Sequence, residues 1–123
     1  MVAATNAAEL LVVEDEWLLA AQLVDLLEEA GLAAEPAPSV EAALRVLEAA
    51  PLRAAILDIN LGQETSFPVA RELARRGIPF VFVTGYADTQ LPDDLGGAPV
   101  LRKPVHAATL LAQLGTILGR SDP

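Results

Sequence analysis

The chain has 123 residues, of which 53% are apolar and 20% are charged, a balance that suits one soluble domain. Seventeen acidic side chains against eight Lys and Arg give a net charge of −9, which disfavours a nucleic acid or an anionic membrane surface as a partner. The sequence has no cysteine, which excludes disulfides and thiolate metal sites. It shows no signal peptide and no membrane-spanning segment, so we expect the protein to be cytoplasmic.

The first part of the chain alternates short apolar runs with amphipathic segments. Residues 10–13 (LLVV) predict a strand buried on both faces, and apolar residues at helical spacing over 19–30 predict a helix after it. The stretch 32–35 predicts a weak edge strand, because the two prolines that follow exclude a long central one. Ser39 can cap a second helix, whose apolar face begins at Val40.

The same alternation continues in the middle of the chain. Residues 54–57 (AAIL) predict a buried strand that ends on Asp58. The stretch 60–64 is predicted to be a loop, and the apolar positions over 69–74 predict a helix that stops at Gly77. This is a third strand and helix pair.

The last part contains the strongest strand signal, residues 80–83 (FVFV), which lead into Thr84. Prolines and glycines then weaken the pattern and leave room for a short helix around 91–95. A short strand is expected at 100–101, followed by a helix whose apolar stripe runs over 110–118.

This order of elements predicts an α/β fold, a doubly wound five-stranded parallel sheet with helices on both faces. In such open sheets, ligands bind beyond the carboxyl ends of the strands, where loops and helix starts converge. The polar residues expected at those ends are Glu14, Asp15, Asp58, Thr84 and Lys103.

These side chains suit the transfer of a phosphoryl group to a carboxylate, a reaction in which two negative groups must approach each other. Asp15 and Asp58 can hold a hard divalent cation such as Mg²⁺, and Glu14 can act through one of the waters of that ion. Lys103 offers a point positive charge, and Thr84 can donate a hydrogen bond to a phosphoryl oxygen.

Each residue also has a simpler interpretation. Asp15 can cap the first helix, Asp58 can be a turn residue, and Thr84 can bond only to backbone. Lys103 can be a solvated surface charge, and Trp17, beside the acids, is expected to be a partly buried aromatic of the first helix. The occurrence of all these polar groups at the ends of four strands favours a site over coincidence.

Four short motifs carry a resemblance to a known family. They are Val-Val-Glu-Asp-Glu (12–16), Ile-Leu-Asp-Ile-Asn (56–60), Val-Thr-Gly (83–85) and Arg-Lys-Pro (102–104). In this order and at strand ends, they make the chain resemble the receiver domains of response regulators in two-component signalling, over nearly its whole length. The resemblance implies the flavodoxin-like receiver fold as a single domain over 1–123, with a core at about 9–119, and the short tails favour a complete small protein.

The resemblance also implies a role for each site residue. Asp58 would be the phosphoacceptor, Glu14 and Asp15 the acidic pair for Mg²⁺ or Mn²⁺, and Asn60 a metal ligand through its backbone carbonyl. Thr84 would be the switch hydroxyl. Lys103 would be the phosphate partner, and its peptide bond to Pro104 would be cis.

One departure from the family pattern concerns the switch. Most receivers have an aromatic residue three positions before the lysine, where this chain has Val100. Residues 79–86 instead resemble the subgroup with a Phe-Ala-Thr-Gly-Tyr motif, many of whose members are single-domain proteins, with Val83 in place of the alanine. Tyr86 is therefore a second switch candidate, and we hypothesise that the segment 86–99 reorders on phosphorylation.

The resemblance implies a signalling module and not an enzyme, with self-catalysed phosphotransfer and dephosphorylation only. A sensor histidine kinase would be the donor, a phosphotransfer or effector protein a further partner, and the chain a monomer or weak dimer. Alternatives are a docking-only pseudo-receiver and a phosphohydrolase with a nucleophilic aspartate, although Asn60 stands where such a hydrolase needs a second aspartate. A flavodoxin-like binding domain would need a phosphate-cradling loop where this chain has acids.

Overall fold

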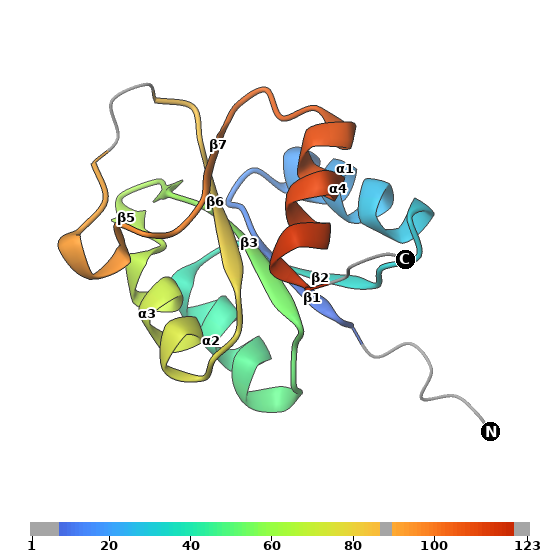
Figure 1. Cartoon of the computed structure of the whole chain (residues 1–123). Coiled ribbons are helices and arrows are strands. Elements are labelled where there is room, and N and C mark those ends of the chain that lie inside the picture. The colour runs from blue at the N-terminus through green and yellow to red at the C-terminus, as the bar shows by residue number, and fades with distance from the viewer. Residues whose placement is uncertain (1–7, 87–89, 120–123) are drawn as a thin grey trace.

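A five-stranded parallel sheet lies at the centre of the computed structural model, which describes residues 8–86 and 90–119 (Figure 1). This confirms the predicted fold class. The strands, in their spatial order, are β2 (Ala34–Ala37), β1 (Leu10–Val13), β3 (Ala54–Asp58), β6 (Phe80–Thr84) and β7 (Val100–Arg102).

Four helices cover the two faces of the sheet, as Figure 1 shows. They are α1 (Trp17–Glu29) and α4 (Ala107–Ile117) on one face, and α2 (Val40–Ala49) and α3 (Phe67–Arg75) on the other. Alternate residues of β1 contribute to the two cores: Leu10 and Val12 pack with the α1 and α4 side, Leu11 and Val13 with the α2 and α3 side. The apolar run that predicted a doubly buried strand is therefore explained by helices on both faces.

The ends of the helices follow the local signals in the sequence. The Ser39 hydroxyl oxygen accepts a hydrogen bond from the Ala42 N–H (3.1 Å), so Ser39 caps α2 as predicted. Gly31 and Gly77 follow α1 and α3 with positive φ angles, a conformation that glycine adopts without the steric cost of a Cβ.

The predicted edge strand lies two residues further along than expected. The pattern placed it at 32–35, whereas β2 spans 34–37 and includes Pro36 opposite Val12. An edge strand is hydrogen-bonded along one side only, so it tolerates a residue without an N–H that a central strand would not. Pro36 is therefore compatible with β2, which lies at the edge of the sheet as predicted.

Two connecting segments have more structure or a different structure than the sequence suggested. The predicted loop at 60–64 is an antiparallel hairpin, β4 (Asn60–Leu61) and β5 (Glu64–Thr65), because Gly62 takes a positive φ of 73° at the turn. The short helix expected around 91–95 is a single 3₁₀ turn, η2 (Asp93–Leu95).

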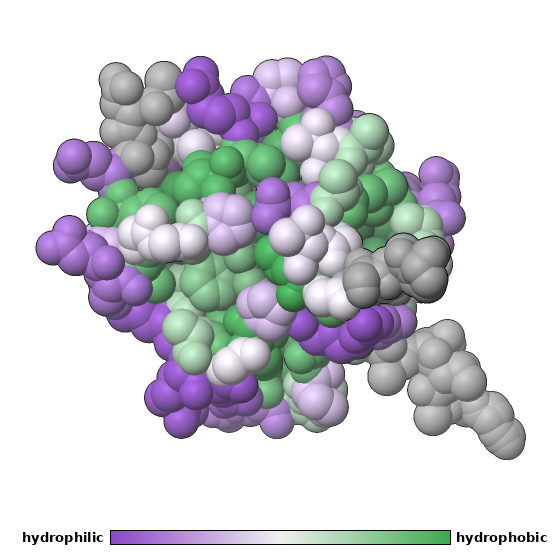
Figure 2. All heavy atoms as spheres, in the orientation of Figure 1, coloured by the Kyte–Doolittle hydropathy of each residue, from purple (hydrophilic) through white to green (hydrophobic). Residues whose placement is uncertain are grey.

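Hydrophilic residues are unevenly distributed over the surface. Figure 2 shows apolar and neutral residues across the middle of the face that carries β7 and α4, with strongly hydrophilic residues mostly at its periphery. The eleven residues of α4 include no charged side chain. Within the described ranges, no helix combines the length and apolar character needed to cross a membrane.

Candidate functional site

The candidate site lies at the carboxyl edge of the sheet, because parallel strands all end on the same side. Glu14 and Asp15 directly follow β1, and Asp58 is the last residue of β3. Thr84 ends β6 and Lys103 follows β7. The structure therefore brings together five polar residues that are up to 89 positions apart in the chain.

Three carboxylates form the acidic part of the site. Glu14, Asp15 and Asp58 each have an oxygen within 4.8 Å of the others. Glu14 and Asp58 are buried, at 3% and 7% exposure, whereas Asp15 is exposed. A cluster of hard oxygen donors that is buried on one side and open on the other fits a Mg²⁺ ion, which keeps several of its waters.

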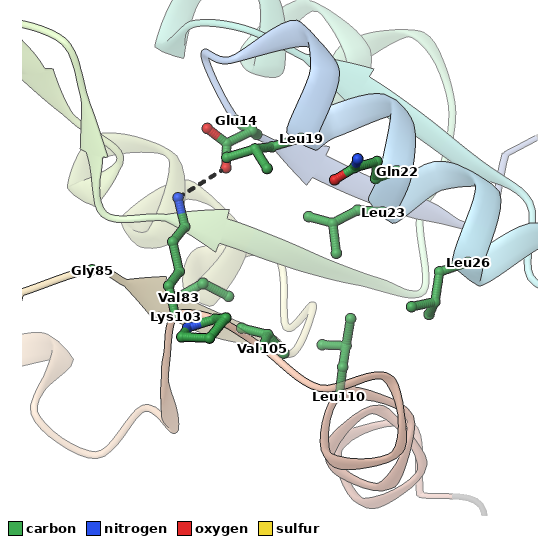
Figure 3. Close-up of a pocket in the computed structure, with 11 residues that line it drawn as sticks. Glu14, Leu19, Gln22, Leu23, Leu26, Val83, Gly85, Lys103, Val105 and Leu110 are labelled. Carbon is green, nitrogen blue, oxygen red and sulfur yellow. Dashed lines mark hydrogen bonds and ion pairs between the residues drawn. The ribbon is translucent and has the colours of Figure 1, made fainter.

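Lys103 is the cation of the site. Its Nζ lies 3.0 Å from Asp58 Oδ2 and 3.2 Å from Glu14 Oε1, and Figure 3 shows the side chain extending to Glu14. Partial burial lowers the pKa of Lys103, but hydrogen bonds and charge from Asp58 and Glu14 outweigh that effect, so the pKa is raised overall. The ammonium therefore stays charged and links the two buried carboxylates.

Glu14 is held in a position that disfavours its charge. Burial raises the pKa of Glu14 above its usual value, and the charge of Asp58 raises it further. Two hydrogen bonds act in the opposite direction, from the Glu16 N–H (3.1 Å) and from Lys103. A second cation in the cluster would relieve the repulsion that remains between the two buried carboxylates.

Backbone contacts fix the position of Lys103. Its N–H donates to the carbonyl of Thr84 (2.8 Å), which continues the pairing of β7 with β6. The Lys103–Pro104 peptide bond is cis, as the resemblance implied.

Asn60 is the first residue of β4, two residues past the end of β3. Its N–H donates to Asp58 Oδ1 (3.3 Å), so the two oxygens of Asp58 contact different groups, Lys103 and the Asn60 backbone. Gly62 lies next to Asp15, since a Cβ added to this glycine would be 3.9 Å from Asp15 Oδ2. The β4–β5 hairpin thus forms one wall of the acidic cluster.

The two switch candidates are joined through the backbone. Thr84 is buried (1% exposed), and its Oγ1 accepts a hydrogen bond from the Tyr86 N–H (3.1 Å). The Tyr86 side chain is 64% exposed. Of the segment hypothesised to reorder, residues 87–89 lie outside the described part of the chain.

Trp17 does not have the environment that the sequence suggested. It is the first residue of α1, and its side chain is 79% exposed, so the prediction of a partly buried aromatic was wrong. The buried residues of α1 are Ala20 and Leu27, whereas Trp17 stands at the first position of the helix, before the part of α1 that packs on the sheet. Trp17 nevertheless lies two residues from Asp15, close enough in sequence to respond to changes at the cluster.

A cavity of about 530 Å³ opens beside the site and is drawn in Figure 3. Leu19, Leu23 and Leu26 of α1 line one side, and Leu110 of α4 faces them. Glu14 and Lys103 lie at its polar end. The charged groups of the site therefore border a cavity whose other walls are mostly apolar.

Sequence reasoning missed the hairpin and its contacts. Gly62-Gln63, with glycine at the first position of a two-residue turn, is a hairpin signal that could have indicated it. The hairpin carries Glu64, whose Oε2 accepts a hydrogen bond from the Val40 N–H (3.1 Å) at the start of α2. Glu64 was read only as part of a loop, because nothing in the local sequence indicates a partner 24 residues earlier.

The family model of the response regulator receiver domain matches residues 10–115 of this chain. A comparison with curated proteins finds no match.

Solved structures share both the fold and the extent of the chain. SdrG from Sphingomonas melonis Fr1 is 40% identical, with a TM-score of 0.76 over 90% of this chain and 96% of SdrG. A response regulator receiver protein from Burkholderia phymatum is 28% identical, with a TM-score of 0.79 over 93% of this chain and 97% of that protein. TrrA from Thermotoga maritima, solved with Mg²⁺ and BeF, is 22% identical, with a TM-score of 0.80 over 89% of this chain and 98% of TrrA.

Proposed function

Because this chain belongs to the response regulator receiver domain family, we propose that it accepts a phosphoryl group on Asp58 from a sensor histidine kinase and thereby changes its binding to a partner. The observation that carries the proposal is the contact of Lys103 Nζ with Asp58 Oδ2 at 3.0 Å, inside a cluster of three carboxylates. One fixed cation beside a buried aspartate, with room for a second, is what attack on a phosphoryl group requires.

The chemical step forms a bond between an oxygen of Asp58 and phosphorus while the bond from phosphorus to the histidine nitrogen of the donor breaks. Lys103 would move from the carboxylate to a phosphoryl oxygen, and Thr84 would donate a hydrogen bond to another. Glu14, Asp15, Asp58 and the Asn60 carbonyl would hold Mg²⁺ or Mn²⁺. When bound, the cation neutralises charge that develops on the phosphoryl oxygens. TrrA, which has this fold, was solved with Mg²⁺ and BeF, in keeping with this assignment.

The output would be a change of surface near Thr84. If Thr84 turns its hydroxyl toward a phosphoryl group, the hydrogen bond between Thr84 Oγ1 and the Tyr86 N–H (3.1 Å) must break or bend. That movement would reach the segment 86–99 directly. The likeness of residues 79–86 to the Phe-Ala-Thr-Gly-Tyr subgroup supports Tyr86 as the switch aromatic in place of Val100. Amide hydrogen exchange of Tyr86 and of residues 90–99 should increase on phosphorylation, and equal exchange in both forms would contradict this switch.

Two other functions are not favoured. A phosphohydrolase with a nucleophilic aspartate would need an acid at position 60, where the amide of Asn60 cannot donate or accept a proton. A docking-only domain is expected to have lost part of the site, and all five polar residues are in place. Receiver domains are in general signalling modules without a catalytic turnover of their own, and loss of the phosphoryl group would be self-catalysed.

The test is incubation with acetyl phosphate or phosphoramidate, with intact mass as the readout. We expect the gain of one phosphoryl group in the presence of Mg²⁺ and none with a chelator, and no gain in Asp58→Asn. Equal labelling of the wild type and Asp58→Asn would contradict the proposal. A panel of phosphorylated histidine kinases would test the donor, and no labelling by any donor would favour the docking-only function.

A further inference from the structure

The β4–β5 hairpin is very short, although two of its residues border the acidic cluster. Its ladder consists of two residue pairs, Asn60 with Thr65 and Leu61 with Glu64, and a hairpin of this size is marginally stable by itself in water. It nevertheless carries Asn60 and Gly62, both of which border the acidic cluster. Contacts outside the ladder must therefore fix its position.

Two of those contacts lie on the side of the core. Leu61 is 5% exposed and belongs to the apolar cluster between the sheet, α2 and α3. The Ser66 N–H, just after the hairpin, donates to the carbonyl of Ile59 (3.0 Å). These contacts anchor the inner strand and the end of the outer strand that leads into α3, but not the turn side of the outer strand, where Glu64 lies.

The outer strand has a further contact near the turn, through the side chain of Glu64. Its Oε2 accepts a hydrogen bond from the N–H of Val40, the first residue of α2, while Ser39 accepts the N–H of Ala42. The two side chains thus satisfy different free amides of the same helix start, and a carboxylate is favoured there by the helix dipole. Across the described residues, no other side-chain hydrogen bond joins the hairpin to α2.

We propose that Glu64 is a positioning residue for the metal site: by capping α2 it fixes the hairpin so that Asn60 and Gly62 stay against the acidic cluster. Glu64 acts through the hairpin and does not touch the cation. The inference rests on the proposed function, because it needs the cluster of Glu14, Asp15 and Asp58 to bind Mg²⁺. Loss of the cap would let the outer strand move and would weaken the cation site without unfolding the sheet.

The test is isothermal titration of the unphosphorylated protein with Mg²⁺. We expect Glu64→Ala to raise the Kd by roughly 3- to 10-fold, below the effect of about 10- to 100-fold typical of groups that contact a metal ligand directly. Glu64→Gln keeps an oxygen acceptor for the Val40 N–H and should return the Kd to within about twofold of the wild type.

Glu41→Ala is the matched control. Glu41 is also an exposed glutamate in the first turn of α2, but its partner is Arg45 and not the hairpin. This variant should lower the urea midpoint of unfolding about as much as Glu64→Ala does and leave the Kd for Mg²⁺ unchanged.

Three outcomes would overturn the proposal. The first is a folded Glu64→Ala with the wild-type Kd, and the second is an equal rise in Kd in Glu41→Ala, which would assign the effect to helix stability. The third is failure of Glu64→Gln to restore binding, which would assign it to charge. Absence of Mg²⁺ binding by the wild type would instead contradict the proposed function itself.

Discussion

Lys103 is the residue on which the electrostatics of the resting site depend. It faces two carboxylates that are almost fully buried, Glu14 and Asp58, and its own side chain is 30% exposed. Burying two like charges side by side is costly, and a single cation between them offsets part of that cost. The same cation would be available to a phosphoryl group once the group arrives.

Replacement of Lys103 by methionine should therefore destabilise the protein in the absence of Mg²⁺. We expect a loss of about 1–3 kcal/mol in the free energy of unfolding, less than for a fully buried pair because the lysine is partly solvated. Excess Mg²⁺ should reduce the loss, since it supplies another cation to the same carboxylates. Urea unfolding with and without Mg²⁺ measures both effects.

Arg102→Met is the control for this prediction. Arg102 is the preceding residue, is exposed, and among the described residues has no acidic partner. Its loss should change the stability by less than about 0.5 kcal/mol. Equal stability of the two variants would contradict the role given to Lys103.

At the scale of elements, α4 shows how a weak local preference is overridden by packing. Its interior Gly115 disfavours a helix, but Leu110 and Leu114 are 1% exposed and pack against the sheet. A Cβ added at Gly115 would meet no atom within 4 Å. The glycine is thus not required by space or by backbone conformation.

Gly115→Ala should stabilise the protein by about 0.5–1 kcal/mol, because alanine loses less backbone entropy on folding. The comparison is Gly119→Ala, at a positive φ of 68°, which should destabilise it. Urea unfolding would measure both, and a destabilised Gly115→Ala would contradict this account of α4.

The end of α3 contains an ion-pair network whose effect should depend on pH. Hydrogen bonds from Arg75 and then Arg76 lower the pKa of Glu72 from 4.5 to about 2. The folded state therefore binds this proton less readily than the unfolded state, so the contribution is present above pH 4.5 and is lost as the pH falls toward 2. Because the two arginines are exposed and Glu72 is only partly buried, salt should reduce the effect.

Glu72→Gln should have a lower urea midpoint than the wild type at neutral pH, and the two should converge as the medium becomes acid. Glu48→Gln, an exposed change on α2, serves as the control and should give no such convergence. A difference between Glu72→Gln and the wild type that does not depend on pH would contradict the ion-pair explanation.

Most elements and the whole sheet could be predicted from the sequence, because the strands are short apolar runs that end in polar residues. Asp58 and Lys103 were predicted as site residues from their positions at those ends, and the structure places them there. The hairpin at Asn60–Thr65 and the partner of Glu64 were not, since they depend on contacts between segments and not on local periodicity. The exposure of Trp17 was missed for a related reason: residue type favours burial, but its position on α1 decides it.

At the scale of the whole molecule, the chain is strongly acidic and gathers part of its negative charge at one edge of the sheet. A ligand that binds only the folded state stabilises it by mass action. Mg²⁺ at about ten times its Kd should therefore raise the free energy of unfolding by about 1.4 kcal/mol. Asp15→Asn should abolish most of this gain, and an equal gain in that variant would mean that Mg²⁺ acts elsewhere.

The central claim is that Asp58 itself takes the phosphoryl group. The most direct measurement is reduction of the labelled protein with borohydride, which converts a phosphorylated aspartate to homoserine, followed by peptide mass spectrometry. The account predicts homoserine at position 58 in samples labelled with Mg²⁺ and none in unlabelled protein. Homoserine at Asp15, or labelling that leaves position 58 as aspartate, would contradict it.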